Sequence, residues 1–554
     1  MKFKLFPKKR NLYRFDAEEI IFEANALQNS DSDSLKQYEG SLGKKSTLLP
    51  LITVLILGFV FTGRINALQT DMDKGLNQQA EGNLFQIEEV VADRGEIFDR
   101  NNTPLVWNTK TPEADFATRN YISTSGFTNV LGFISPPLKD NNDNFARSTY
   151  EARSGVEKVY DAWLQGENGI IRSETDASLS VLSGQKINPA NNGKNLHLSI
   201  DADIQAAMYD SIKSLAEKTG FARGSGAIMD IETGELLALT NYPEYSRDFN
   251  TDSNQSFINL FTHGRFTPGS IVKPFMALAA LNEGIISPNK SILSTKTIVI
   301  PNRYDPSNPT LFSDWKAHGY VDVREAISVS SNAYFYAVGG GLYDQEGIGI
   351  NNINKYMDAF GLGEPVGIRD YEAVSSIVPS ISWKAANYPA DPTWRLGDTF
   401  LTSIGQYGWQ VTPLHMLRGV SAIANRGTLV EPTLLSGNDP NTESVPISIS
   451  DNTYQIVHEG MRRSATEGTA RGLNVSYVDI AAKTGTAELG VSKANVNSWV
   501  MGFWPYDDPK YSFVVVMNEG SRYNLTGATF AMRQLFDWMR DNKSDYLGDI
   551  NSIK

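Results

Sequence analysis

The chain has 554 residues, of which 41% are hydrophobic and 10% aromatic, so it can bury the cores of two or three domains. It has no cysteine and five histidines, which excludes disulfides and thiolate chemistry, and no close histidine pair points to a metal. The formal net charge of −13 argues against a nucleic-acid partner, because phosphate binding needs a basic surface. We therefore expect no metal, no cofactor and no nucleic acid.

An uncharged apolar run lies near the N-terminus, at residues 46–63, and reads STLLPLITVLILGFVFTG. Its length approaches the roughly 20 residues of a membrane-spanning helix. The leader of residues 1–45 is too long for the n-region of a signal peptide, and no small-residue cleavage site follows the run. A retained anchor is therefore favoured over a cleaved signal. Lysine and arginine are concentrated before the run, which predicts a cytoplasmic N-terminus and an external remainder.

The next segment, residues 65–190, is rich in Asn, Ser, Gly and Asp and contains only short apolar runs. This pattern is typical of a small, irregular α+β domain, and the polar loop at 187–195 marks its end. We accordingly expect four parts: a polar cytoplasmic tail at 1–45, a transmembrane anchor at 46–64, a non-catalytic domain at 65–190 and a larger domain at 191–545.

The larger domain shows clearer periodicity. Residues 201–220 predict an amphipathic helix capped by Asp201 or Asp203 and stopped by Gly220. Residues 224–243 predict a β-hairpin that turns at Gly234. Helices are expected at 270–283, about 322–338 and about 351–359, strands at 478–489, 497–505 and 510–520, and a closing helix at 528–542. Together these elements predict an antiparallel sheet flanked by helices.

A serine and a lysine stand three residues apart in RFTPGSIVKPF, at Ser270 and Lys273. Serine after Pro-Gly is a favoured N-cap, and residues three apart share a helix face, so the amine can approach the hydroxyl. A serine nucleophile needs a base, and lysine serves only when neutral, which burial favours. By itself the spacing is weak, because it also occurs at Ser41/Lys44, Ser183/Lys186, Ser287/Lys290 and Ser313/Lys316.

Two later motifs single out this pair. They are Ser330-Ser331-Asn332, at the start of an expected aromatic-rich helix, and Lys483-Thr484-Gly485-Thr486, inside an expected strand. Ser-x-x-Lys, Ser-x-Asn and Lys-Thr-Gly, in this order, are the signature of penicillin-recognising serine enzymes. Two decoys are placed wrongly: Lys218-Thr219-Gly220 ends a helix before Ser270, and Ser450-Asp451-Asn452 opens a helix shortly before Lys483.

With these motifs in place, the chain resembles the class B penicillin-binding proteins, which are membrane-anchored peptidoglycan D,D-transpeptidases. RGEIFDRNNTPL at 94–105 resembles an element of their non-catalytic domain, with Asn102 where glycine is usual, and the similarity extends over about residues 90–540. The resemblance implies an α+β fold: a five-stranded antiparallel sheet flanked by helices, an all-helical subdomain, and a smaller irregular α+β domain after the anchor. Tyr407 in GQYGW and residues 369–376 depart from the family pattern, which leaves these loop shapes open.

The resemblance also implies the site. Its catalytic residues are Ser270, Lys273, Ser330, Asn332 and Lys483. Its substrate-binding residues are Ser331, Thr484, Gly485 and Thr486. Ser270 would attack a D-Ala-D-Ala carbonyl with Lys273 as the base, and the acyl group would pass to an amine of a neighbouring stem peptide. The N–H groups of Ser270 and Thr486 would form the oxyanion hole.

A monofunctional transpeptidase is favoured over four alternatives. The short tail at 1–45 argues against a β-lactam-sensing receptor, and the large non-catalytic domain argues against a β-lactamase among the hydrolases, which also include a D,D-carboxypeptidase. The intact motifs argue against a scaffold with a dead site, and the segment before residue 190 is too short for the glycosyltransferase of a bifunctional enzyme. The expected partners are peptidoglycan stem peptides, β-lactams, the bacterial cytoplasmic membrane through one N-terminal helix, a membrane glycan polymerase, and elongation or division proteins.

Overall fold

The computed structural model describes residues 50, 52–67, 85–141, 143–175, 181–246, 258–302, 305–368, 373–437 and 444–548. The chain forms two compact units, residues 1–86 with 175–182 and residues 87–174 with 183–554. In the first unit residues 52–67 are helical, while the expected tail at 1–45 and residues 46–49 and 51 of the expected span lie outside the described residues. Of the helices that are described, none is both long and apolar enough to cross a membrane.

The N-terminal part of the second unit is built from short strands and single helical turns. One four-stranded sheet has the order β11-β2-β3-β4, and residues of β1, β9 and β10 belong to a three-stranded sheet. Asn102, in the turn between β2 and β3, has φ +64, the left-handed conformation expected of it. The elements between residues 85 and 197 are β1 (Phe85–Val90), β2 (Ile97–Phe98), β3 (Pro104–Thr109), β4 (Thr118–Tyr121), α3 (Thr128–Leu131), β5 (Ile134–Ser135), β6 (Leu138–Lys139), β7 (Phe145–Arg147), β8 (Glu151–Ala152), α4 (Gly155–Val159), α5 (Asp161–Leu164), β9 (Gly169–Thr175), β10 (Val181–Asn188) and β11 (Leu196–His197).

A buried ion cluster holds this part together. The fully buried carboxylate of Glu157 accepts hydrogen bonds from Nε of Arg94 at 2.6 Å and from Nε of Arg119 at 2.8 Å. Arg94 Nη1 also lies 2.6 Å from Asp161, and Arg94 Nη2 donates to the carbonyl of Glu157. The cluster joins β4, α4 and α5 to the segment before β2. Because the charges are desolvated, removing one partner leaves the others uncompensated.

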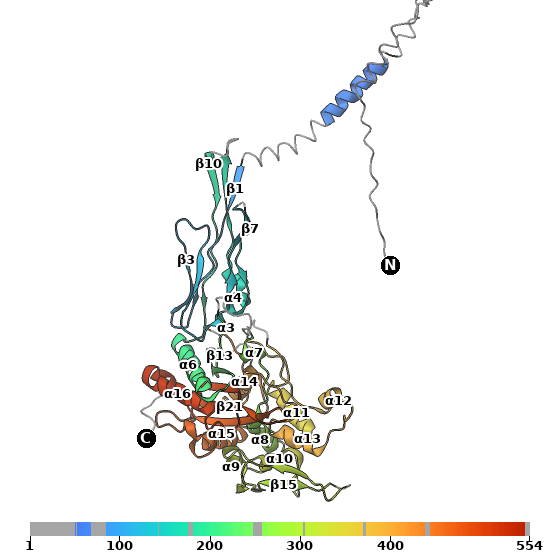
Figure 1. Ribbon diagram of the computed structural model, residues 1–554, viewed down its shortest axis with the longest axis vertical. Coiled ribbons are helices and arrows are strands. Elements are labelled where there is room, and N and C mark those ends of the chain that lie inside the picture. Colours follow the sequence, from blue (N-terminus) through green and yellow to red (C-terminus); the bar gives the residue numbers. More distant parts are fainter. Residues whose placement is uncertain are drawn as a thin grey trace, which may run out of the picture. The chain divides into compact units, whose positions relative to one another are not determined.

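The centre of the second unit is a five-stranded sheet of order β13-β12-β22-β21-β20, in which every neighbouring pair is antiparallel. Helices α6 and α16 pack against one face, and α14 packs against the other (Figure 1). Successive residues of a strand pack on opposite faces of the sheet: Ile228 and Val515 pack on the side of α6, and Met229 and Val514 pack on the side of α14. The elements are α6 (Ala202–Thr219), β12 (Arg223–Asp230), β13 (Leu236–Tyr242), α14 (Pro413–Ala424), β20 (Ala481–Leu489), β21 (Asn495–Trp504), β22 (Tyr511–Ser521) and α16 (Ala528–Asn542).

Several sequence predictions in this region are confirmed. Asp201, rather than Asp203, caps α6 by accepting from the N–H groups of Asp203 and Ile204, and Gly220 ends the helix at φ +74. The hairpin at 224–243 and the three C-terminal strands also form as expected. The Lys-Thr-Gly-Thr motif therefore lies on β20, an edge strand of the sheet.

The expected helix at 270–283 is wrong at its start. A 3₁₀ turn, η1 (Gly269–Val272), precedes α8 (Lys273–Asn282), so Ser270 lies inside the turn and is not an N-cap. The cause is Pro274, which has no N–H to donate to the carbonyl of Ser270 four residues earlier. Lys273 N donates to that carbonyl instead, in the tighter 3₁₀ pattern.

The expected helix at 322–338 is two helices, α9 (Val323–Ser328) and α10 (Asn332–Gly340). The break occurs at Ser330, whose φ of +58 no helix accommodates. The hydroxyl of Ser331 then accepts from Tyr334 N and starts the second helix as its N-cap. The helix expected at 351–359 is present as α11 (Gly349–Ala359).

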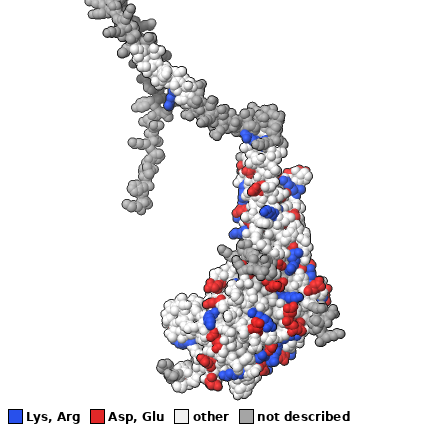
Figure 2. All heavy atoms as spheres, turned by 180° about the vertical axis from the view of Figure 1, so that it is seen from behind, with Lys and Arg blue, Asp and Glu red and all other residues white. Residues whose placement is uncertain are grey.

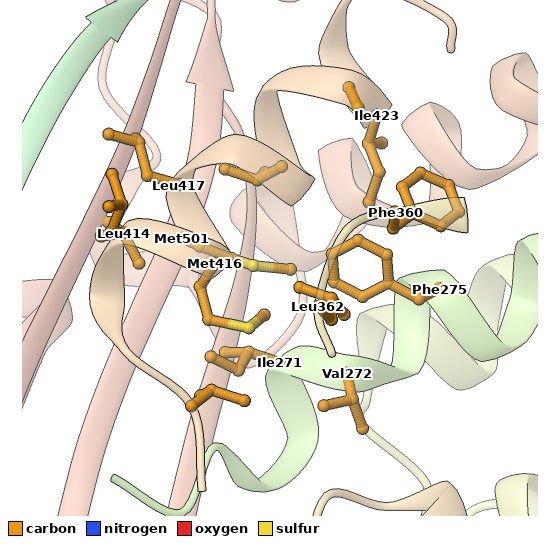
Figure 3. Packing of buried hydrophobic residues seen from close by; sticks show 14 of the residues in the cluster. Ile271, Val272, Phe275, Phe360, Leu362, Leu414, Met416, Leu417, Ile423 and Met501 are labelled. Atoms are coloured by element: carbon orange, nitrogen blue, oxygen red, sulfur yellow. The ribbon is translucent and has the colours of Figure 1, made fainter. Parts of the chain in front are cut away.

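Helix α8 is buried on all sides from Lys273 to Ala280, as expected of a helix that is apolar all round. Figure 3 shows Phe275 of α8 beside Phe360 and Leu362, with Met416 of α14 close to Ile271. The remaining elements of the unit are α7 (Leu260–His263), β14 (Ile292–Ser294), β15 (Thr297–Ile300), β16 (Thr310–Ser313), β17 (Gly319–Val321), α12 (Ile381–Asn387), α13 (Leu396–Ser403), β18 (Thr428–Leu429), β19 (Val445–Pro446), α15 (Asp451–Thr466), η2 (Arg471–Leu473) and η3 (Ser544–Leu547). On the face drawn in Figure 2, basic and acidic side chains are interspersed among the described residues.

The buried ion cluster leads to a stability prediction. Glu157→Ala should lower the free energy of unfolding by about 3–5 kcal/mol, because two buried guanidinium groups lose their carboxylate. The matched control is Glu151→Ala: Glu151 is 40% exposed and pairs with Arg147 and Arg153, so about 0–1 kcal/mol is expected. Urea unfolding followed by circular dichroism measures both. Equal small losses for the two variants would contradict a structural role for the cluster.

Candidate active site

Lys273 is one of the two fully buried lysines of the predicted site. It is fully buried, and its Nζ donates to the carbonyl of Ser330 at 2.8 Å and to Oδ1 of Asn332 at 2.8 Å. The ring of Phe335 lies 5.6 Å from the amine. Burial lowers the pKa of Lys273 to about 7, against a smaller opposing influence of the Asp314 carboxylate. Near neutral pH a large fraction of this amine is therefore neutral and able to accept a proton.

Ser270 is half-buried in η1, one residue into the turn that leads to Lys273. Its hydroxyl makes no hydrogen bond with any residue that the structure describes, including Lys273. The expected direct pairing of this serine and lysine is thus not formed, because the lysine amine is held by the Ser330–Asn332 segment. The Ser270 hydroxyl thus has no partner among the described residues, one helical turn before an amine whose pKa is lowered to about 7, and such pairs often close only when a substrate is bound.

The hydroxyl of Ser330 lies between two amines. Lys483 Nζ donates to Ser330 Oγ at 2.8 Å, and Lys273 Nζ lies 3.3 Å from the same oxygen. The left-handed backbone at Ser330 brings both its carbonyl and its hydroxyl to Lys273. Lys483 is also fully buried, and burial together with the nearby Lys273 places its pKa well below the usual value for lysine. Mutual repulsion disfavours a charge on both amines at once, so this hydroxyl joins two groups that can exchange a proton.

A buried carboxylate that no sequence motif indicated supports this segment. Asp314 Oδ2 accepts from Ser331 Oγ at 2.9 Å and from Ala333 N at 2.9 Å, while its Oδ1 accepts from Trp315 N at 2.8 Å. Asp314 therefore fixes the start of α10, where Asn332 and Ser330 point to Lys273. Its only sequence signal is its position inside Ser313/Lys316, one of the rejected Ser-x-x-Lys pairs.

Ser331, expected to bind substrate, is fully buried and holds the backbone instead. Its hydroxyl contacts Asp314, accepts from Tyr334 N at 3.0 Å and lies 2.7 Å from Ser294 Oγ. This placement makes Ser331 a positioning residue for its neighbours on either side.

The Lys-Thr-Gly-Thr strand packs directly against the turn that carries Ser270. A Cβ at Gly485 would lie 2.7 Å from the carbonyl of Pro268, and a Cβ at Gly269 would lie 2.6 Å from that of Thr486. Gly269 also has φ +60, so glycine is required there for two reasons. This close approach brings Ser270 to the part of β20 where Thr486 is exposed.

Two contacts of this region were not expected from the sequence. Thr484 Oγ1 donates to Thr469 Oγ1 at 2.7 Å, and Gly269 N donates to the carbonyl of Gly405 at 3.0 Å. A Cβ at Gly405 would lie 2.1 Å from the carbonyl of Gly269. The 405–408 loop, whose sequence departs at Tyr407, turns through left-handed backbone there at φ +61 and still packs on the nucleophile turn. Residues 369–372 of the other departing segment lie outside the described residues.

The two motif matches rejected from the sequence, Ser450-Asp451-Asn452 and Lys218-Thr219-Gly220, lie at helix ends as expected. Ser450 caps α15 by accepting from Thr453 N, and Lys218-Thr219-Gly220 lies at the end of α6. His263 contacts the hydroxyl of Thr262 at the end of α7. No cluster of His, Asp and Glu suited to a metal ion occurs within the described ranges.

Known proteins are similar to this chain in sequence and in fold. Residues 224–537 match the family model of the penicillin binding protein transpeptidase domain, and residues 114–198 match that of the penicillin-binding protein dimerisation domain. The chain is 28% identical over 478 residues to the peptidoglycan D,D-transpeptidase MrdA of Salmonella typhimurium (strain SL1344), covering 77% of this chain and 73% of the relative. It is 26% identical over 370 residues to the peptidoglycan D,D-transpeptidase FtsI of Escherichia coli (strain K12), covering 66% of this chain and 58% of the relative.

Two solved structures share the fold. One is a chain of the complex between penicillin-binding protein PBP2 and MreC from Helicobacter pylori, with a TM-score of 0.67 and 23% identity over 83% of this chain and 99% of that chain. The other is Pseudomonas aeruginosa PBP2 in complex with WCK 5153, with a TM-score of 0.67 and 23% identity over 82% of this chain and 97% of that chain. The transpeptidase model alone spans more than half of the 554 residues. The chain therefore belongs to the class B penicillin-binding proteins.

Proposed function

We propose that this protein is a serine-type peptidoglycan D,D-transpeptidase that β-lactams acylate. The observation that carries the proposal is the Lys273 amine: fully buried, with its pKa lowered to about 7, held by Ser330 and Asn332, and one helical turn from Ser270. A neutral amine beside an unpaired serine hydroxyl is an activated nucleophile. The names of the MrdA and FtsI relatives support the same reaction.

The geometry supports the following sequence of steps. Ser270 Oγ attacks the carbonyl of the penultimate D-Ala while its proton passes to Lys273. The N–H groups of Ser270 and Thr486 stabilise the developing oxyanion. The C–N bond then breaks, and Ser330, linked to Lys273 and Lys483, supplies the proton with which D-Ala leaves. An amine of a neighbouring stem peptide then attacks the ester carbonyl and gives up a proton to Lys273. The C–O bond to Ser270 breaks as the new C–N bond forms, and Ser270 Oγ takes that proton back from Lys273.

The strand β20 supplies the recognition of the donor. Lys483, Thr484, Gly485 and Thr486 bind the terminal carboxylate, and Asn332 contacts the peptide amide while it holds Lys273. A bound carboxylate raises the pKa of Lys483 again, because an opposite charge nearby favours the ammonium form. Binding of the donor carboxylate thus stabilises the ammonium form of Lys483, which burial by itself disfavours.

The domain organisation belongs to the same proposal. A tail at 1–45 lies in the cytoplasm, residues 46–64 anchor the chain in the bacterial cytoplasmic membrane, and the parts at 65–190 and 191–545 lie outside, the latter carrying the chemistry. The apolar run at 46–63 and the family matches at 114–198 and 224–537 support this division.

The anchor has a direct test. In cells, the full chain should stay in the membrane pellet after alkaline carbonate extraction, because an apolar span is not released by loss of surface charge. A variant that lacks residues 1–64, exported by a cleavable signal, should appear in the soluble fraction. Release of the full chain by carbonate would contradict the anchor.

The proposed partners are the stem peptides of nascent glycan strands, a membrane glycan polymerase and elongation or division proteins. A relative with this fold was solved with MreC, and another belongs to a peptidoglycan synthase complex that coordinates polymerisation and crosslinking.

The nucleophile can be tested by labelling. A fluorescent penicillin should bind the protein covalently, and Ser270→Ala should abolish labelling, because no other hydroxyl lies at the start of α8. Ser287→Ala is the matched control, since Ser287 is exposed and belongs to a decoy Ser-x-x-Lys pair. Persistent labelling of Ser270→Ala would contradict the assignment, and rapid turnover of the drug by the parent protein would indicate a hydrolase instead.

The base leads to a pH prediction. The rate of penicillin acylation should rise with pH and reach half its plateau near pH 7, because Lys273 accepts a proton only in its neutral form and its pKa is about 7. Below that pH the ammonium form dominates and the rate should fall about tenfold per pH unit. Lys273→Arg, which stays charged at every accessible pH, should leave little acylation across the profile.

Asp314 provides the control for this profile. Its carboxylate raises the pKa of Lys273, so Asp314→Asn should move the midpoint to lower pH. A variant that loses rate without a shift of the midpoint would show a purely structural role for Asp314. A midpoint near 10 in the parent protein would contradict Lys273 as the base.

A further inference from the structure

Three consecutive residues at the end of β16 and just after it contact the segment that carries the Ser-x-Asn motif. The carbonyl of Ser313 accepts from Asn332 Nδ2 at 3.3 Å, and Asp314 fixes the start of α10 as described above. Trp315 Nε1 donates to the carbonyl of Val329 at 3.2 Å. Val329 is the residue before the serine of the proposed proton relay, so this indole lies directly beside the relay.

Trp315 is held in place and yet faces solvent. Its backbone N–H donates to Asp314 Oδ1 at 2.8 Å, and its ring meets that of His318 at a centroid distance of 5.0 Å and an angle of 64°. The residue is nevertheless 59% exposed. An aromatic side chain that is already fixed loses little conformational entropy when a ligand covers it, and it offers a large apolar face. Trp315 is therefore suited to contact a ligand at the relay.

A different part of the chain connects the relay segment to β20. Thr469 N donates to the carbonyl of Ser328 at 3.1 Å, and Thr469 Oγ1 accepts from Thr484 Oγ1 at 2.7 Å. In the proposed function β20 binds the carboxylate of the donor peptide. Among the described residues, the hydrogen bonds and ring contacts of Trp315 involve no residue of β20. The donor therefore has no assigned use for this indole.

The chemistry of the second half-reaction requires another ligand at the relay. In the first half-reaction D-Ala leaves as an amine that has gained a proton through Ser330. Transfer is the same step run backwards with a different amine, so the acceptor nitrogen has to arrive where the D-Ala nitrogen left. The part of the acceptor beyond its nitrogen then lies against groups beside Ser330 that the donor does not use. Trp315 is such a group.

The acceptor has a chemistry that a tryptophan face recognises. A side-chain amine of a stem peptide ends an alkyl chain, and in water it is mostly an ammonium ion, because the pKa of an alkylamine is about 10. The face of a tryptophan attracts a cation within about 6 Å of its ring, and it packs against the methylene groups that precede the charge. After the ammonium loses one proton to solvent, the alkyl chain keeps its contact with the ring.

We propose that Trp315 is a specificity-determining residue of the acceptor site, where its ring packs against the alkyl chain of the incoming amine and directs the nitrogen to the acyl-enzyme. The neutral nitrogen forms a C–N bond to the ester carbonyl, and its proton passes through Ser330 to Lys273. Ser270 Oγ takes this proton as its C–O bond breaks. The inference rests on the proposed function, since an acyl-enzyme at Ser270 has to form first.

The test measures how the acyl-enzyme divides between an amine and water. The donor is a peptide that ends in D-Ala-D-Ala, and the acceptor is either α-N-acetyl-lysine amide, whose amine ends a long alkyl chain, or methylamine. Chromatography separates the amide product from the acid. Trp315→Ala should lower the ratio of amide to acid about three- to tenfold with the lysine derivative. The ratio with methylamine and the rate of penicillin labelling should stay unchanged, because neither depends on the ring.

The matched control is Trp163→Ala. Trp163 is 50% exposed, and its Nε1 also donates to a backbone carbonyl, that of Asn195 at 3.1 Å, but it lies on α5, far along the chain from the motifs. This variant should leave every ratio unchanged. Trp315→Phe keeps an aromatic face without the indole N–H, so it should retain most of the preference for the lysine derivative. A loss as large as that of Trp315→Ala would contradict the ring contact.

Two results for Trp315→Ala would overturn the acceptor role: equal losses with the two acceptors, or a parallel fall in penicillin labelling. Either would mean that the residue only supports the backbone before Ser330. A parent protein that releases D-Ala but forms no amide would overturn the role as well. Failure of the proposed function would look different, because penicillin would then not label the parent protein at Ser270 and no D-Ala would be released.

Discussion

The burial of the Lys273 amine is the constraint on which the rest of the site depends. A lysine side chain in water carries a charge that makes it useless as a base at neutral pH. Here full burial at the start of α8 lowers its pKa to about 7, while Ser330 and Asn332 keep the amine hydrogen-bonded. The protein must therefore hold a desolvated amine without letting it pair with a carboxylate.

In the folded protein the nearby carboxylate, Asp314, makes its hydrogen bonds to other groups and none to the Lys273 amine. Asp314 is buried among Ser331, Ala333 and Trp315, where it fixes the start of α10 and acts on Lys273 only through space. A direct ion pair would have favoured the charged lysine and removed the base. Ser330 supplies neutral hydrogen-bond acceptors in place of a carboxylate, because its left-handed backbone turns both its carbonyl and its hydroxyl towards the amine.

Close backbone packing sets the other half of the site. Gly269, Gly405 and Gly485 allow the nucleophile turn to lie directly on β20 and on the 405–408 loop, at distances that a Cβ would block.

The order of Ser-x-x-Lys, Ser-x-Asn and Lys-Thr-Gly-Thr identified the candidate site residues without a structure, because each motif places a required functional group within a local element. Periodicity likewise predicted α6, the hairpin at 224–243 and the C-terminal strands. Periodicity could not predict the break at Ser330, because the break depends on a left-handed backbone conformation at that residue. Nor could it predict the 3₁₀ turn at Ser270, because the turn forms where Pro274 has no N–H to continue the α-helical hydrogen bonds.

What only the tertiary structure decided are properties of distance and burial. The lowered pKa of Lys273, the burial of Ser331, the support from Asp314 and the contact between Thr484 and Thr469 all depend on contacts between different segments of the chain. No local pattern encodes such contacts, because desolvation and hydrogen bonding depend on what surrounds a side chain in space. The sequence by itself determined which groups are available for the chemistry; the packing of η1 against β20 and of α8 against α10 decided their protonation and their partners.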